Sequence, residues 1–402
     1  MKKKVMVLSG MPSQIPIINK LHEMGCLVYD VNLLEDSPAF KIADYSAVMN
    51  ILDKEACLKY AKDNKIDAIM SEQCDIATTT IAYVASELGL PGIGNDMARL
   101  YTNKYAMREF GIANGIPTPE YKICYSKREA IDFFVKLGKK MIIKPLDSNS
   151  SRGVYTIETI EDLEEHFDTT LANSLREKAV LCERYITGTE FTVDGLVTRK
   201  GHVCLAISEK HHYPHNDNIA DELFFSHKND RFDYDLLRET NNRFVNLSGL
   251  KFGLTHAEYK YEDGKYYLIE IGARGGGNFI SSTIVPIMSG VDNYDYIVKK
   301  YLNIEFDDAV EVNPDLIDRC CVLKFFDTPN KGGIVKDIKG LDFIKNNSNI
   351  IDFKLNFEIG DCIEPAKDDA ARIGYYIAYA DSKNELRALM NKIESEFDIE
   401  ME

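Results

Sequence analysis

Short apolar runs alternate with amphipathic segments over the first hundred residues. The runs at 5–9, 27–31 and 68–71 have the length of buried strands. Between the first two lies the segment 14–24, whose apolar residues have helical spacing and which ends at a glycine. Alternating strands and helices predict an α/β fold with a doubly wound parallel sheet in residues 1–100.

Two segments in the middle of the chain show signals of helices. The capping box Ser126-x-x-Glu129 precedes a predicted helix at 130–137, and Gly138 ends it. A second helix is indicated by apolar residues that we expect to be core: Ile160, Leu163, Phe167, Leu171 and Leu175.

The last part of the chain, residues 306–402, shows strand-like runs at 319–326 and 372–380. A helix follows, opened by the capping box Ser382-x-x-Glu385. We expect a small C-terminal α+β cap, and its composition offers no catalytic group of residues. Its expected role is to complete a substrate pocket or to form a homodimer surface.

Candidate chemistry begins with a predicted β-hairpin. Two strand-like runs, LTHAEYKY with Glu258 and KYYLIEI with Glu270, flank the turn residues Asp263 and Gly264. Two carboxylates on one face could bind one Mg²⁺ or Mn²⁺. A plain two-residue turn would instead place Glu258 opposite Ile269, so a shared metal requires an odd-numbered loop or a bulge near the turn. The alternative is an ordinary hairpin with exposed acids.

Arg274 follows Glu270 by four residues and precedes three glycines. A guanidinium can pair bidentately with a carboxylate or a phosphate, and glycines allow the backbone to approach a ligand closely. The pattern therefore predicts an arginine at a phosphate site. Alternatively, Arg274 pairs with a neighbouring acid and stiffens the turn.

Lys144 ends an apolar run and is followed by a small-residue loop that contains Ser150, Ser151, Arg152 and Gly153. Such a loop can offer backbone N–H groups and hydroxyls to phosphates. The loop matches neither GxxxxGK[ST] nor GxGxxG. We therefore expect phosphate binding of another kind.

Two glutamates, Glu183 and Glu190, flank a turn at Gly188. Where the chain doubles back, their carboxylates would lie near each other, as an adenosine clamp requires.

Taken together, the elements resemble the ATP-grasp superfamily, and within it the carboxylate–amine ligases, including the L-amino acid ligases. Biotin carboxylase and carbamoyl phosphate synthetase are more distant relatives. The motifs that carry the similarity are Asn103-Lys104, Lys144-Pro145, Ser150-Ser151-Arg152-Gly153, Glu183-Arg-Tyr-Ile, Gly188-x-Glu190, Glu258 and Glu270-x-x-x-Arg274.

The resemblance implies a central ATP-grasp fold in residues 101–305, with a lid subdomain at about 120–186, and ATP with Mg²⁺ or Mn²⁺ as cofactors. In such a fold Lys104 and Lys144 would hold the α- and β-phosphates. The loop 147–153 would close over the triphosphate.

The remaining roles are implied in the same way. The adenine amino group would donate to Glu183, and the ribose hydroxyls would be held by Glu190. The adenine edge would be lined by the backbone of Arg184, Tyr185 and Ile186. The metal ions would be bound by Glu258 and Glu270, and Arg274 and Glu270 would be the catalytic residues, with Arg274 stabilising the charge that develops during phosphoryl transfer.

One position departs from the family pattern. Many relatives carry asparagine two residues after the second metal-binding glutamate, where this chain has Gly272. The function that the resemblance implies is an ATP-dependent ligase that joins a small carboxylate, such as an amino acid, to an amine. The alternatives are a carboxylase or formyl-type ligase of purine or biotin metabolism, and a nucleotide sensor without turnover.

Composition narrows the classes of partner. The formal net charge of −16 argues against a nucleic-acid partner. With 45% hydrophobic residues but no run of eighteen apolar ones, we expect a cytoplasmic protein that does not enter a membrane. Nine cysteines without CxxC spacing suggest buried thiols, with adjacent Cys320 and Cys321 the one pair that could have redox meaning.

The roles of two further segments are not decided by the sequence. Parallel sheets bind ligands at the carboxyl ends of their strands, so residues 10–13 and the segment from Glu72 to Asp75 are candidate substrate contacts. Three histidines, His211, His212 and His215, could belong to a structural metal site, a substrate-facing loop or a solvated loop.

Overall fold

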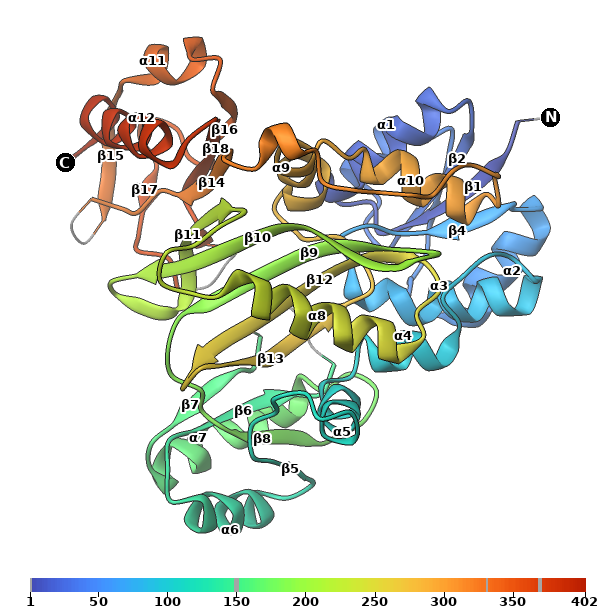
Figure 1. Ribbon diagram of the computed structural model, residues 1–402, viewed down its shortest axis with the longest axis horizontal. Helices are drawn as coiled ribbons and strands as arrows, with labels where there is room; N and C mark the ends of the chain where they lie inside the picture. The colour runs from blue at the N-terminus through green and yellow to red at the C-terminus, as the bar shows by residue number, and fades with distance from the viewer. Residues whose placement is uncertain (1, 148–151, 330–331, 368–370) are drawn as a thin grey trace.

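A parallel sheet forms the N-terminal domain of the computed structural model, which describes residues 2–147, 152–329, 332–367 and 371–402 (blue in Figure 1). Its strand order is β3-β2-β1-β4. The elements are β1 (Lys4–Leu8), α1 (Ile15–Glu23), β2 (Leu27–Asn32), β3 (Tyr45–Val48), α2 (Lys54–Asn64), β4 (Ala68–Met70) and α3 (Asp75–Leu88). The predicted α/β arrangement is confirmed. Strand β3 escaped prediction because it lies at the sheet edge and is largely exposed, so its sequence lacks a buried apolar run.

Two helices, α4 (Asn95–Leu100) and α5 (Lys104–Ala113), lead into a second sheet that is antiparallel, with the order β5-β8-β6-β7. It lies below the central sheet in Figure 1, and it is the region expected as the lid subdomain. Its elements are β5 (Tyr121–Cys124), α6 (Lys127–Leu137), β6 (Met141–Pro145), β7 (Tyr155–Ile157), α7 (Ile160–Ala172) and β8 (Val180–Arg184).

The local signals of this subdomain hold except at the two ends of the apolar stripe. Ser126 accepts a hydrogen bond from the Glu129 backbone and caps α6, which ends at Gly138 in the left-handed conformation. Leu163 and Phe167 are buried in the subdomain core. Leu175 is exposed, because α7 ends at Ala172 and the apolar stripe does not reach that far. Ile160, the first residue of α7, is exposed as well. The assignment of these two residues to the core was therefore wrong.

Eight strands form the central sheet, in the order β13-β12-β9-β10-β11-β14-β18-β16. Helix α8 lies across one face of it in Figure 1. The elements of this region before residue 305 are β9 (Glu190–Thr198), β10 (Gly201–Tyr213), β11 (Asn216–Ser226), α8 (Tyr234–Ser248), β12 (Gly253–Glu262), β13 (Lys265–Gly272), the π-helical turn η3 (Ile280–Ile284), α9 (Val285–Ser289) and α10 (Asn293–Tyr301).

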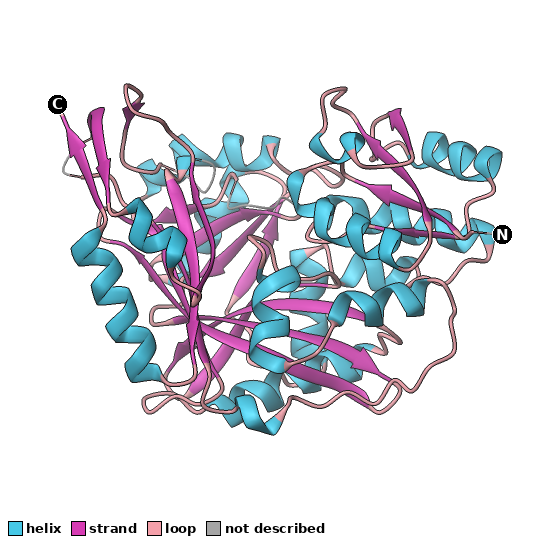
Figure 2. Cartoon of the chain, turned by 90° about the horizontal axis from the view of Figure 1, so that it is seen from above, coloured by secondary structure: helices cyan, strands magenta, loops and turns pink. Residues whose placement is uncertain are grey.

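The C-terminal part continues the central sheet. Strand β14 pairs with β11, and Val322 stands opposite Phe224. A separate small sheet, β17-β15-β19, lies at the same end of the molecule, opposite the N-terminus in Figure 2. The elements are β14 (Cys320–Phe325), β15 (Gly333–Lys339), α11 (Leu341–Asn346), β16 (Ile350–Leu355), β17 (Cys362–Ile363), β18 (Gly374–Ala380), α12 (Lys383–Glu396) and β19 (Asp398–Met401).

The N-terminal domain and the central sheet share one hydrophobic core. Helix α10 packs against α1 and β4, and its buried Ile297 and Val298 belong to the same apolar cluster as Val5 and Ile69. This packing fixes the carboxyl ends of the parallel strands against the glycine turn after β13. All nine cysteines are free thiols and most of them are buried, as expected.

Candidate active site

The hairpin of β12 and β13 places Glu258 directly opposite Glu270. The condition that the two carboxylates lie on the same face of the hairpin is therefore met. The predicted position of the bulge, near the turn, was wrong. The turn itself has two residues, with Glu262 opposite Lys265. The register shifts farther along the hairpin, where Tyr259 pairs with Leu268. Ile269 is therefore the extra residue of this irregularity. Both carboxylates can thus face one ligand.

Lys104 lies beside this pair. It is the first residue of α5, which Asn103 caps by accepting a hydrogen bond from the Ala106 backbone. Its buried Nζ lies 2.8 Å from Glu270 Oε1. A side chain expected to bind phosphate therefore stands next to one expected to bind metal, as a metal–triphosphate ligand would require.

A buried cluster connects α5 to the lid subdomain. Lys144 Nζ on β6 lies 2.8 Å from Glu183 Oε2 on β8, and the guanidinium of Arg108 pairs with both oxygens of Glu183. Burial raises the pKa of Glu183, but the charges of Arg108 and Lys144 outweigh it and lower this pKa to about 2. Both Glu183 oxygens thus accept from side chains of the protein, and its proposed contact with adenine stays a prediction.

On the facing strands, a lysine joins two expected ligand groups. Lys210 Nζ lies 2.5 Å from Glu190 Oε1 and 3.0 Å from Glu258 Oε1. Although burial raises the pKa of Glu190, the charge of Lys210 lowers it to about 2. His212 Nε2 stands 3.6 Å from Glu190, so the histidine-rich segment borders the site.

The other two histidines of that segment do not form a metal centre. His211 lies 3.6 Å from Glu209 and His215 lies 3.7 Å from Asp327. Within the described residues, no group of three or more histidine, cysteine or acidic side chains could hold a metal ion. The paired Glu258 and Glu270 remain the candidate metal carboxylates, which fits Mg²⁺ because it takes one or two carboxylates together with substrate phosphates.

Arg274 is held by the N-terminal domain. Its Nε and Nη2 donate to the two oxygens of Asp75, at 2.9 and 2.6 Å. The pair is mostly buried, so it is not a surface ion pair. It also explains Gly272, because a Cβ there would lie 2.8 Å from Asp75 Oδ1 and 3.2 Å from Arg274 Nε. An asparagine at 272 has no room beside this pair.

Two acids flank the glycine turn after β13. Buried Glu72 accepts from the Gly275 backbone at 3.2 Å, and burial raises its pKa to about 7. Asp194 accepts from the Gly276 backbone at 3.2 Å and pairs with His256 Nδ1 at 2.9 Å. Burial lowers the pKa of His256, but Asp194 raises it to about 9. The glycines thus bring backbone N–H groups and two carboxylates close together.

The remaining predicted residues lie around the lid sheet. Arg184 pairs with Glu262 at 2.7 Å, the ring of Tyr185 has Lys140 and Lys260 over it, and Ile186 is buried. The Gly153 carbonyl accepts from Thr170.

Arg152 also belongs to the described part of the chain. Ser150 and Ser151 lie outside the described residues. Their expected contacts with phosphate stay predictions.

Several residues of the site were missed. Arg108 follows Lys104 by four residues on one helix, and this spacing could have indicated a shared face. Lys210 directly precedes His211, and no pattern in that segment marks it as a partner of two glutamates. Nothing in the sequence marks Asp194 and His256 as partners, because they come from different strands.

Two family models match the chain. The ATP-grasp domain matches residues 137–283, which contain Lys144, Glu183, Glu258, Glu270 and Arg274, and the L-amino acid ligase C-terminal domain 2 matches residues 325–402. Residues 137–283 therefore form an ATP-grasp domain. The C-terminal part of the chain is of the kind found in L-amino acid ligases, and the expected resemblance is confirmed.

Solved structures agree on this fold. L-amino acid ligase from Bacillus licheniformis superposes with a TM-score of 0.81 at 20% identity and covers 100% of this chain and 99% of its own. Phosphoribosylglycinamide synthetase from Anaerococcus prevotii gives 0.75 at 17% identity, with both chains covered completely. At such identities the likeness establishes the fold alone.

Curated relatives match parts of the chain. An uncharacterized protein, y4rH, of Sinorhizobium fredii is 22% identical over 78% of this chain and 64% of its own length. Formate-dependent phosphoribosylglycinamide formyltransferase of Maridesulfovibrio salexigens is 27% identical over 41% of this chain and 42% of its own. The matches thus span less than two thirds of these relatives. In the part of this chain that the structure describes, no helix is long and apolar enough to cross a membrane.

Proposed function

We propose that the protein is an ATP-dependent ligase that joins a small carboxylate, such as an amino acid, to an amine. The observation that carries the proposal is the alignment of Glu258 and Glu270 on one hairpin, with Lys104 beside them and Arg274 on the turn that follows. Cations and paired acids are what phosphoryl transfer needs, since the protein contributes mainly positioning and charge stabilisation.

The residues present fit a nucleotide. Buried Nη1 of Arg108 has no hydrogen-bond partner among the described residues, although the rest of this guanidinium is paired. An orphaned buried donor beside Lys144 suits an acceptor oxygen or nitrogen of a bound nucleotide. We propose that Lys104 and Lys144 hold the phosphates, while Glu258 and Glu270 bind Mg²⁺, which supplies charge neutralisation during transfer.

Arg274 would orient the acid substrate. Its guanidinium is fixed by Asp75 and lies beside the glycine turn, where it can face the carboxylate that accepts the γ-phosphoryl group of ATP. The transfer forms a carboxyl O–P bond and releases ADP. The amine nitrogen then attacks the acyl carbon, loses a proton and displaces phosphate.

An amino-acid substrate is supported by the acids at this end of the site. Glu72 and Asp194 both approach the turn at Gly275 and Gly276, so an ammonium group there would meet carboxylates. Asp194 Oδ2 is buried and has no partner within the described ranges, so it can accept a further donor.

The test is ADP release by purified protein with Mg²⁺ and ATP, using pools of amino acids and then single pairs, with products identified by mass spectrometry. A ligase releases ADP only when an acid and an amine are both present, and the condensed product appears. Release that depends on bicarbonate or formate would identify the carboxylase or formyl-type alternative. Nucleotide binding without release under any condition would identify a sensor.

A further inference from the structure

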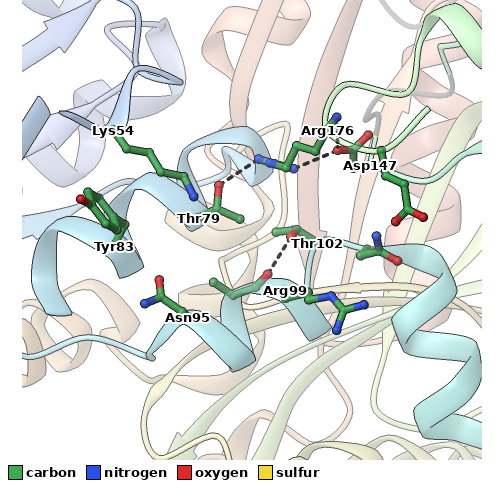
Figure 3. A pocket seen from close by; sticks show the side chains of 11 residues that line it. Lys54, Thr79, Tyr83, Asn95, Arg99, Thr102, Asp147 and Arg176 are labelled. Carbon is green, nitrogen blue, oxygen red and sulfur yellow. Dashed lines mark hydrogen bonds and ion pairs between the residues drawn. The ribbon is translucent and has the colours of Figure 1, made fainter. Parts of the chain in front are cut away.

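Arg176 connects the N-terminal domain to the lid subdomain. Its Nη1 lies 3.3 Å from Asp147 Oδ2, while Nη2 donates to Thr79 Oγ1 at 3.0 Å and approaches the Ile76 carbonyl at 3.4 Å (Figure 3). Asp147 is held further by the backbone N–H groups of Leu175 and Arg176, at 2.7 and 2.9 Å. One guanidinium therefore contacts both domains.

Both ends of this bridge lead to the candidate active site. Asp147 comes three residues after Lys144, just beyond the last residue of β6. On the other side, Ile76 follows Asp75 in the first turn of α3, and Asp75 holds Arg274. The bridge thus joins the backbone near a phosphate-binding lysine to the backbone near the arginine of the acid site.

We infer that Arg176 is a positioning residue that sets the distance between the phosphate-binding side and the acid-binding side of the site. The inference rests on the proposed function for its link to catalysis. Phosphoryl transfer depends on the alignment of the donor phosphate with the acceptor carboxylate, and a misplacement of one ångström is costly. Arg176 touches neither group and acts through Asp147 and the first turn of α3.

The surroundings of Arg176 allow it to be changed without opening a core. Its side chain is 33% exposed, whereas that of Asp147 is 3% exposed. It lines an open pocket of about 390 Å³ whose wall also contains Arg99. The exposed side chain of Arg99 makes no ion pair within the described residues, so it provides a matched arginine on the same wall.

The decisive experiment measures binding of Mg²⁺ and the non-hydrolysable nucleotide AMP-PNP by calorimetry, together with kcat and the KM for ATP and for the acid. For Arg176→Met we expect affinity for AMP-PNP to fall about fivefold or more, the usual scale of coupling between sites. Arg176→Lys keeps the charge but reaches fewer partners, so it should lie between. Arg99→Met should bind AMP-PNP like the parent.

A double-mutant cycle separates positioning from a general structural effect. Thr79→Val should weaken AMP-PNP binding in the parent but add nothing in the Arg176→Met background, because the link is already broken. Parental affinity in Arg176→Met, or an equal effect of Thr79→Val in both backgrounds, would overturn the inference. This cycle needs no turnover, so it decides the role of Arg176 even if no acid–amine pair releases ADP.

Discussion

Arg108 donates from Nη2 to the backbone carbonyl of Ile269 at 2.7 Å. Ile269 is the extra residue of the irregularity that aligns Glu258 with Glu270. The same guanidinium neutralises Glu183 of the lid subdomain. One side chain thus anchors the hairpin of Glu258 and Glu270 and the lid sheet to α5, and the irregularity provides an acceptor that a regular ladder would have used elsewhere.

Replacement of Arg108 should destabilise the protein strongly. Arg108→Met leaves Glu183, which is 1% exposed, with Lys144 as its remaining cation. Breaking a buried ion pair typically costs about 3–5 kcal/mol. We expect a loss of this order in the free energy of unfolding, measured by urea denaturation. Adding Glu183→Gln should not restore this loss, because the buried ammonium of Lys144 then loses its carboxylate, and parental stability in the double variant would contradict this account.

Glu270→Gln should separate binding from turnover. The substitution keeps the shape of the side chain but removes a charge from the expected metal site, so kcat should fall roughly 100-fold or more. Binding of the nucleotide should change little, because Lys104 and Lys144 remain. Asp263→Asn in the turn of the same hairpin is the control, and parental turnover of Glu270→Gln at saturating Mg²⁺ would remove Glu270 from the catalytic residues.

Arg274→Lys tests the need for a guanidinium. Lysine is a point charge and cannot pair bidentately with Asp75 while facing a substrate carboxylate. We expect kcat to fall at least about 100-fold while affinity for ATP changes little. Asp75→Asn should cause a smaller loss in the same parameter. Equal kcat in parent and Arg274→Lys would show that the arginine only stiffens the turn.

The acid Glu72 should make stability depend on pH. Burial raises its pKa from 4.5 to about 7. Between these values the folded protein holds a proton that the unfolded chain releases, so the free energy of unfolding should fall as pH rises and level off above about 7. Glu72→Gln should remove roughly 3 kcal/mol of this dependence, measured by denaturation from pH 4.5 to 8.

A second buried acid provides the control for that experiment. Burial also raises the pKa of Asp30 to about 7, and Asp30 lies within β2, where the proposed function assigns it no role. Asp30→Asn should therefore flatten the stability curve in the same way. Only Glu72→Gln should change the pH profile of turnover, and identical turnover profiles for both variants would exclude Glu72 from the substrate site.

Local patterns predicted much of the fold. The runs that became β1 and β2, the capping box at Ser126, and the hairpin around Gly264 each depend on neighbouring residues alone. Alternation along the strands showed that Glu258 and Glu270 can share a face only if the hairpin contains a bulge or an odd-numbered loop, and the structure contains such an irregularity. The position of the irregularity did not follow from this alternation, because any residue of β13 could have been the extra one.

Ion pairs between distant segments of the chain could not be predicted from local sequence patterns. Asp75 and Arg274 are 199 residues apart, and Arg108 and Glu183 are 75 residues apart. Each is a charged residue whose partner depends on how domains pack, which one sequence does not record. The small size required at Gly272 is of the same kind, because it follows from the Asp75–Arg274 pair lying against that backbone.

The pairing of β14 with β11 makes the C-terminal part inseparable from the rest of the molecule. Removal of residues 306–402 would turn β11 into an edge strand, with unpaired backbone groups along it and with Phe224 stripped of its partners in the C-terminal core. Such an edge is a template for pairing with another chain. A truncated protein should therefore self-associate rather than survive as a smaller ATP-binding unit, so domain exchange between relatives has to cut elsewhere.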